Sequence, residues 1–262
     1  MAALRRDLQA QRFDLAIDLQ GLVKSALWAR QAGAPVGGFD RASVREPLAA
    51  LAYRHTAAVP QRLRSVARYR ALTAALVGYP VPAGPPRFGL QPPAPTAAPD
   101  RPYAVLMPAS SRPQALWPMD GWIAVARWLS SQGVQPWVFW GNAAEREMAE
   151  RLVAACNGLL PPLQPLDRVA ATLAGARLVV SLDTGLAHLA VALGRPTVGI
   201  YGDQHVWKNG LTGEGPTISL GGKGQPPTVE AVMAAVQDLW RRGDVASGGV
   251  EPGAAEVVDR LA

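Results

Sequence analysis

The sequence predicts an α/β protein in which two parallel sheets belong to two separate domains. From residue 103 onward, strand-sized apolar runs alternate with helical patterns, which is typical of a parallel sheet covered on both faces. Near the N-terminus, the stretch RFDLAIDLQGLVKSALWARQAG predicts a strand over 13–17 and a helix over 22–31. This βα unit indicates a first domain of the same kind.

The remaining elements are predicted from the spacing of apolar residues and from the Gly and Pro residues that end helices and strands. Helical patterns cover REPLAALAYR (45–54) and RLRSVARYRALTAALVG (62–78), and a proline-rich stretch that favours neither helix nor central strand follows them. Beyond it we expect strands at 103–107, 136–140, 177–182 and 197–201. We expect helices at about 119–132, 143–156, 167–174, 185–193 and 228–241, and a flexible tail after Arg242. The second domain is therefore predicted to be Rossmann-like.

Charge favours an anionic partner without choosing among the possible kinds. The 26 Lys and Arg residues exceed the 20 Asp and Glu residues, which gives a formal charge of +6. Nucleic acid, an acidic membrane surface and a phosphorylated small molecule all fit that balance. However, the arginines are dispersed among helical patterns and no nucleic-acid-binding module is present, so we expect no nucleic acid partner.

Several other classes are excluded by what the sequence lacks. Cys156 is the single cysteine, so an internal disulfide and a cysteine-rich metal site are ruled out. Apolar runs fall short of a membrane span and the N-terminus does not resemble a secretory signal, so we expect a cytoplasmic protein. The motifs of serine hydrolases, P-loop NTPases, dinucleotide dehydrogenases and zinc peptidases are missing.

The stretch SLDTGLAHL, which begins at Ser181, places polar residues where a buried strand meets a helix. Asp183 and Thr184 precede that helix, and Gly185 allows close approach of the backbone. A helix N-terminus of this kind can hold a phosphate, but Asp and Thr are also ordinary N-cap residues. His188, one turn into the helix, is either a site residue or a hydrogen-bonded core histidine.

Other polar residues follow the neighbouring predicted strands. Ser110, Ser111 and Arg112 form either a phosphate or sugar clamp or a serine-rich turn. Glu145 lies in the first turn of a helix, where it either complements the helix dipole or accepts hydrogen bonds from sugar hydroxyls. In YGDQHVWKNG, the candidates for closing the site are Asp203, His205 and Lys208. Ligands of parallel sheets bind at the carboxyl ends of strands, where all these loops lie.

Taken together, these motifs resemble a known family. SLDTGLAHLAVALGRPTVGIYG resembles the donor-site signature of the bacterial lipopolysaccharide heptosyltransferases of glycosyltransferase family 9. DLQGLVKSAL, REPLA and the WP that follows the Ser-Ser-Arg loop occur in the family's order and are similar to its heptosyltransferase I group. The resemblance runs from about Phe13 to Trp240.

The resemblance implies a GT-B fold with two facing Rossmann-like domains, of which the N-terminal one is incomplete. It implies an acceptor-side domain at 1–82, a linker at 83–101 and a donor domain at 102–262. The implied reaction is inverting transfer of L-glycero-D-manno-heptose from ADP-heptose to the first Kdo of Kdo2-lipid A, at the cytoplasmic face of the inner membrane. No metal or other cofactor is expected.

The resemblance also implies roles for individual residues. Asp183 would contact heptose hydroxyls, and Glu145 would bind the nucleotide ribose. Thr184, Gly185 and Leu186 would present a hydroxyl and backbone N–H groups to the diphosphate. The full donor set expected is Asp183, Thr184, Gly185, Leu186, His188, Ser110, Ser111, Arg112, Glu145 and Lys208. The candidates on the acceptor side are Gln20, Lys24 and Arg45.

The sequence departs from the family pattern at two points, and these leave a second function open beside the transferase. The chain begins near the family's third strand, so the catalytic aspartate of the family is expected upstream, and Asp18 is not assigned as its replacement. Ala115 stands where the family usually has a lysine that contacts the donor phosphates, and Arg112 or Lys208 is the expected substitute. The alternative is a non-catalytic nucleotide-sugar-binding module that keeps only the donor site.

Overall fold

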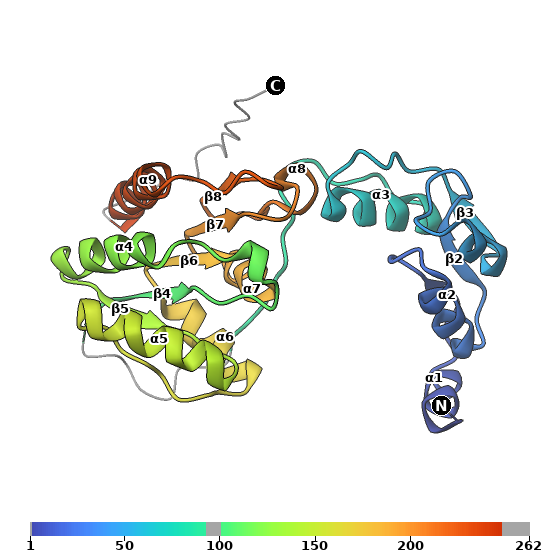
Figure 1. Ribbon diagram of the computed structural model, residues 1–262. Coiled ribbons are helices and arrows are strands. Elements are labelled where there is room, and N and C mark those ends of the chain that lie inside the picture. The colour runs from blue at the N-terminus through green and yellow to red at the C-terminus, as the bar shows by residue number, and fades with distance from the viewer. Residues whose placement is uncertain (1, 93–100, 248–262) are drawn as a thin grey trace. The chain divides into compact units, whose positions relative to one another are not determined.

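The chain divides between Gly84 and Pro85 into two compact units, each of the α/β class (Figure 1). The computed structural model describes residues 2–92 and 101–247. Within those ranges, no helix is both long and apolar enough to cross a lipid bilayer. No helix or strand lies between Val77 and Tyr103 in the described part of the proline-rich stretch.

The first unit is built on a short parallel sheet. Its strands pair in the order β1-β2-β3, with Ala16 opposite Val36 and Gly37 opposite His55. The elements are α1 (Ala2–Ala10), β1 (Ala16–Ile17), α2 (Val23–Ala29), η1 (Arg30–Ala32), β2 (Val36–Phe39), η2 (Pro47–Ala52), β3 (His55–Ala57) and α3 (Ser65–Val77), where η marks a 3₁₀ helix.

Two glycines let β2 lie at the centre of this sheet. A Cβ atom on Gly38 would come within 2.4 Å of the Tyr53 ring, and one on Gly37 within 2.9 Å of Leu76. Glycine is rare inside strands, so the sequence VGGF carries no strand signal, although here it admits side chains from both neighbours. The strand was missing from the prediction for this reason.

The predicted helix over 45–54 is wrong. Residues 47–52 form a 3₁₀ helix, Tyr53 has extended backbone, and the chain then enters β3. Pro47 at the first position suits a helix start. The helix ends early because Tyr53 turns inward, where its hydroxyl donates to Asp18 Oδ2 at 2.6 Å.

Asp18 is the polar centre of the first unit. Its carboxylate is buried and accepts hydrogen bonds from the Tyr53 hydroxyl, the Ser25 hydroxyl and the backbone N–H groups of Gln20 and Gly21. These four donors offset the cost of burying a charge. Asp18 therefore joins β1 to α2 and η2, which supports leaving it unassigned as a catalytic base.

The second unit contains a larger sheet with helices on both faces. Its elements are β4 (Tyr103–Met107), η3 (Pro113–Ala115), α4 (Met119–Ser131), β5 (Gln135–Val138), α5 (Ala143–Cys156), α6 (Leu166–Gly175), β6 (Leu178–Leu182), α7 (Gly185–Ala192), β7 (Thr197–Tyr201), α8 (Val206–Asn209), β8 (Thr217–Gly221) and α9 (Val229–Ser247).

All five strands of this sheet are parallel and pair in the order β5-β4-β6-β7-β8, which Figure 1 shows from bottom to top. Alternate residues face opposite layers. Leu106 and Val180 pack with α4, α5 and α9, whereas Val105 and Val179 pack with α6 and α7. Strand order reverses between β4 and β6, and a crevice is expected at this switch point.

Most predicted elements of the second unit are confirmed to within two residues, but the last helix is longer than predicted, and η3, α8 and β8 are additional. The strand β8 was not expected, since TISLG lies among glycines and pairs only along one edge with β7. The helix α9 continues to Ser247, so flexibility directly after Arg242 is wrong. The predicted behaviour of residues 248–262 lies outside the described residues.

The Asp18 hydrogen bond gives a stability prediction. Tyr53→Phe removes one buried donor and is expected to lower the free energy of unfolding by about 1–2 kcal/mol in urea titrations at pH 7. Burial, and then the hydrogen bond and charge of Asp18, raise the pKa of Tyr53. The unfolded phenol ionises near pH 10, so the advantage of the wild type is fully present below that pH and shrinks as the pH rises above it.

The exposed Tyr79 supplies the control for this comparison. Tyr79→Phe should leave the free energy of unfolding unchanged at pH 7 and also above pH 10. Equal unfolding energies for Tyr53→Phe and the wild type at pH 7 would contradict the assignment of Asp18 as the polar centre.

Candidate functional site

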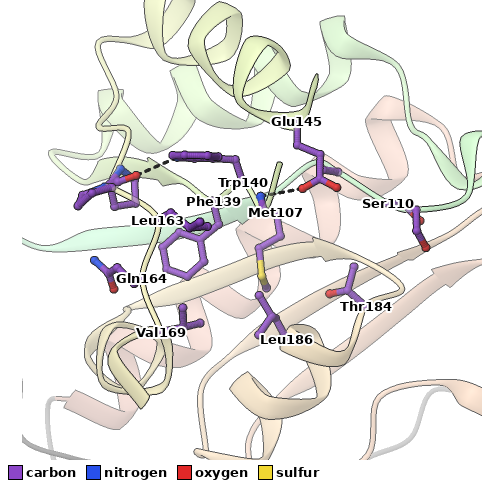
Figure 2. Close-up of a pocket in the computed structure, with 15 residues that line it drawn as sticks. Met107, Ser110, Phe139, Trp140, Glu145, Leu163, Gln164, Val169, Thr184 and Leu186 are labelled. Atoms are coloured by element: carbon purple, nitrogen blue, oxygen red, sulfur yellow. Dashed lines mark hydrogen bonds between the residues drawn. The ribbon is translucent and has the colours of Figure 1, made fainter. Parts of the chain in front are cut away.

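A cavity of about 230 Å³ opens at the switch point of the second unit. It is lined by residues from the ends of β4, β5 and β6 and by the segment between α5 and α6. Figure 2 places Phe139 and Val169 at one end, and Ser110 and Thr184 at the other. One end is therefore apolar and the other polar.

The polar end begins at the turn between β6 and α7. Thr184 has extended backbone and is the N-cap of α7, since its hydroxyl accepts from the N–H of Ala187 at 3.3 Å. The hydroxyl of Ser181 lies 3.2 Å from that of Thr184 and forms a hydrogen bond with it. A Cβ atom on Gly185 would meet no atom within 4 Å, so the helix start is open on that side. The N-cap interpretation is correct for Thr184, which also lines the cavity.

Asp183 has a different role from its neighbour, because it pairs with Arg112 instead of capping the helix. Arg112 Nη2 lies 3.1 Å from Asp183 Oδ2, and Arg112 Nε lies 3.4 Å from Asp203 Oδ2. Both carboxylates are largely buried, with 14% and 13% of their side chains exposed. The guanidinium therefore joins the loops that follow β4, β6 and β7.

His188 faces the same acid from inside α7. Its Nε2 lies 3.9 Å from Asp183 Oδ1, and its side chain is about half exposed, so it is not a core residue. Burial lowers the pKa of His188 and outweighs the opposing effect of the Asp183 carboxylate. The neutral imidazole is therefore favoured near pH 7, where it can donate or accept a hydrogen bond.

The loop after β4 brings hydroxyl groups to the cavity. Ser110 Oγ accepts from the N–H of Arg112 at 3.2 Å, which stabilises the turn. Ser110 and Ser111 also line the cavity, so the two alternatives for this loop, a turn and a ligand clamp, are compatible.

Glu145 closes a capping arrangement at the start of α5. Its carboxylate accepts from Gly141 N at 2.8 Å and from Asn142 Nδ2 at 2.7 Å, while Asn142 Oδ1 accepts from Glu145 N. Figure 2 shows the first of these bonds beside the cavity. Because each carboxylate oxygen can accept a second hydrogen bond, Glu145 can bind a ligand hydroxyl without leaving this cap.

The apolar end was not anticipated from the sequence. Trp140 Nε1 donates to Pro161 O at 2.9 Å and so ties the end of β5 to the segment after α5. That segment contributes four consecutive lining residues, Pro161 to Gln164. Prolines between two helices indicate only a loop, and the sequence gives no signal that this loop returns to the sheet edge. Together with Phe139 and Val169 it forms a slot suited to a flat apolar group.

Other predicted residues lie away from the cavity. Lys208 is half-buried on α8, and His205 stands before that helix with its ring 6.1 Å from that of Trp207; neither lines the cavity. Gln20, Lys24 and Arg45 are exposed residues of the first unit. Ala115 is buried, with only 4% of its surface exposed.

The fold and the site define a Rossmann-like domain of the class that binds nucleotides at strand ends. A sequence model described as glycosyltransferase family 9 (heptosyltransferase) matches residues 1–233. The chain belongs to this family.

Two curated members of this family are similar to the chain over most of its length. Lipopolysaccharide heptosyltransferase 1 of Pseudomonas aeruginosa is 40% identical over 201 residues, which are 76% of this chain and 57% of the relative. The protein of the same name in Escherichia coli K12 is 39% identical over 207 residues, covering 76% of this chain and 64% of the relative. The chain thus spans less than two thirds of the length of these relatives.

The fold of the chain is also similar to solved structures of a heptosyltransferase. The E. coli heptosyltransferase WaaC with ADP has a TM-score of 0.79 and 34% identity, covering 91% of this chain and 76% of that chain. The same enzyme with ADP-2-deoxy-2-fluoro heptose has a TM-score of 0.76, also with 34% identity, covering 90% and 76%. The predicted GT-B fold class is confirmed by these matches, which include both units.

Proposed function

We propose that the second unit binds ADP-heptose in the cavity at the switch point. The carrying observation is the polarity of the cavity: an apolar slot at one end, and Thr184 at the N-terminus of α7 with Ser110 and Ser111 at the other. The Arg112–Asp183 pair belongs to the two adjoining loops, next to Ser111 and Thr184 in the chain. The slot suits the adenine ring. Helix N–H groups and the serine hydroxyls suit the diphosphate. WaaC, which binds ADP and an ADP-heptose analogue, supports this orientation through its 34% identity.

The substrate contacts follow from where the side chains lie. Asp183 and His188 face one another at 3.9 Å beside the N-terminus of α7, so we assign them to the sugar hydroxyls. Thr184, Gly185 and Leu186 would present a hydroxyl and backbone N–H groups to the phosphates, with Ser110 and Ser111 opposite. Glu145 would accept from the ribose. Lys208 stays a candidate for closing the site from α8.

We propose that the protein is a heptosyltransferase I, which transfers heptose with inversion to the first Kdo of Kdo2-lipid A. Relatives with this name are about 40% identical. The departing ADP gains negative charge as the glycosidic bond breaks, and Arg112 with the helix N-terminus stabilises that charge. Because this field is supplied by the protein, we expect donor binding without a metal or other cofactor. We assign the general base to none of the described residues.

One observation favours the second candidate, a donor-binding module without transfer activity. Asp18, the buried carboxylate directly after β1, already accepts four hydrogen bonds from its own unit, so we do not assign it as the general base. ADP binding combined with no heptose transfer to Kdo2-lipid A would select this candidate. Transfer that releases ADP would select the enzyme.

We also propose that the first unit attaches the protein to the cytoplasmic face of the inner membrane. Residues 1–84 contain 12 Lys and Arg against 5 Asp and Glu, whereas the rest of the chain contains 14 against 15. The excess positive charge therefore lies entirely in the first unit. There η2 exposes Leu48 and Leu51 by 68% and 76% on one 3₁₀ face, between Arg45 and Arg54 in the chain. Exposed leucines beside cations suit an anionic lipid surface.

Filling the cavity tests the donor site directly. Val169→Trp places an indole in the apolar slot and is expected to weaken ADP binding by about tenfold or more, measured by calorimetry. Leu166→Trp is the matched control, because Leu166 is 65% exposed on the same helix and does not line the cavity. Unchanged ADP affinity in the folded Val169→Trp variant would remove the cavity from the proposal.

Vesicle sedimentation tests the membrane surface. The double variant Leu48→Ser/Leu51→Ser is expected to bind phosphatidylglycerol vesicles roughly fivefold more weakly, because two leucines no longer enter the interface. Leu163→Ser/Leu166→Ser removes two similarly exposed leucines from the second unit and should bind like the wild type. Equal losses in both variants, or binding to phosphatidylcholine vesicles that matches binding to phosphatidylglycerol, would contradict the proposal.

A further inference from the structure

Arg112 uses only one of its nitrogens to pair with Asp183. A guanidinium that faces a carboxylate frequently forms two parallel hydrogen bonds with it. Here a single nitrogen, Nη2, reaches Asp183 Oδ2, while Nε is turned to Asp203 Oδ2. The second oxygen of Asp183 therefore faces His188 Nε2 at 3.9 Å and has no close cationic partner among the described residues.

Asp203 is held firmly in the position that causes this division. Its loop packs on η3, since a Cβ atom on Gly202 would lie 3.4 Å from Gln114 O and 3.7 Å from Ala115 Cα. These contacts are to backbone atoms of η3. The backbone that carries Asp203 is thus fixed against the segment that follows Arg112.

The surroundings of Asp203 offer little else to compensate for its burial. Its side chain is 13% exposed, and its Oδ1 is buried with no hydrogen-bond partner in the described part of the chain. A buried acceptor without a partner is unfavourable, because it has lost its hydrogen bonds to water. The contact that compensates for its charge is the one to Arg112.

We propose that Asp203 is a positioning residue for sugar recognition. By holding Arg112 Nε, it prevents the guanidinium from pairing with both oxygens of Asp183, and it so keeps Asp183 Oδ1 available to a sugar hydroxyl. This inference rests on the proposed function, in which Asp183 binds the donor sugar. It also accounts for the place of Arg112, which is held by two acids next to the cavity-lining Ser111.

The consequence of removing the charge is specific to the sugar. In Asp203→Asn, Nε loses its anion and the guanidinium turns to form a second bond with Asp183. The sugar then competes with Arg112 for both oxygens. The nucleotide and diphosphate contacts made by the cavity and by α7 are unaffected.

The experiment compares ADP with ADP-heptose on the full chain by calorimetry. The quantity measured is the dissociation constant of ADP divided by that of ADP-heptose. This ratio reports the contribution of the sugar to binding. Asp203→Asn is expected to lower this ratio about tenfold, as the loss of one charge-assisted hydrogen bond does, with ADP affinity itself changed less than about twofold. Asp203→Glu retains the anion and should keep most of the ratio.

Further variants separate positioning from a general structural effect. In an Asp183→Asn background, Asp203→Asn should lower the ratio no further, because Asp203 acts through Asp183. Asp238→Asn is the matched control, since it breaks an Asp–Arg pair, Asp238 with Arg242 at 2.9 Å on α9, away from the cavity. It should leave both affinities unchanged. If Asp203→Asn does not fold, Asp203→Ser supplies the same comparison.

The outcomes distinguish the two levels of the proposal. A wild type that binds neither ADP nor ADP-heptose overturns the proposed function and this inference with it. A wild type with a clear sugar contribution that Asp203→Asn retains overturns the inference alone. An additive loss in the double variant also overturns it, because Asp203 would then act independently of Asp183.

Discussion

The parallel pairing of β4 with β6 is the constraint on which the site depends. It places Met107 opposite Ser181, so the loops that follow both strands begin at one edge of the sheet. β5 pairs on one side of β4, and β7 on the far side of β6, and both strands end at this same edge. Residues more than 70 positions apart, Arg112 and Asp183, meet for this reason. Without that pairing, the α7 N-terminus, the serine loop and the cation would be unrelated features.

The sequence predicts the second unit better than the first because the two units rely on different signals. β4, β6 and β7 are buried on both faces, and their continuous apolar runs indicate strands directly. β2 depends on Gly37 and Gly38, whose value lies in the space they leave for Tyr53 and Leu76. η2 ends where it does because Tyr53 turns inward to Asp18. Contacts that are distant in sequence decided those elements, and no local pattern encodes them.

The same division applies to the site. Chain position at strand ends identified Asp183, Thr184, Ser110 and Glu145, because parallel topology alone brings such residues together. The wall from Pro161 to Gln164 escaped prediction, because a proline-rich loop gives no indication of what it packs against. The partnership of Arg112 with two acids was equally inaccessible, since it requires the register of three strands.

Hydrogen–deuterium exchange with and without ADP tests the central claim most directly, which is that the loops at this sheet edge form one nucleotide site. Exchange is expected to slow in residues 108–112, 140–145 and 183–187 when ADP is added, with the first unit unchanged. Protection confined to residues 2–84, or no protection in the loop between β6 and α7 at saturating ADP, would contradict it.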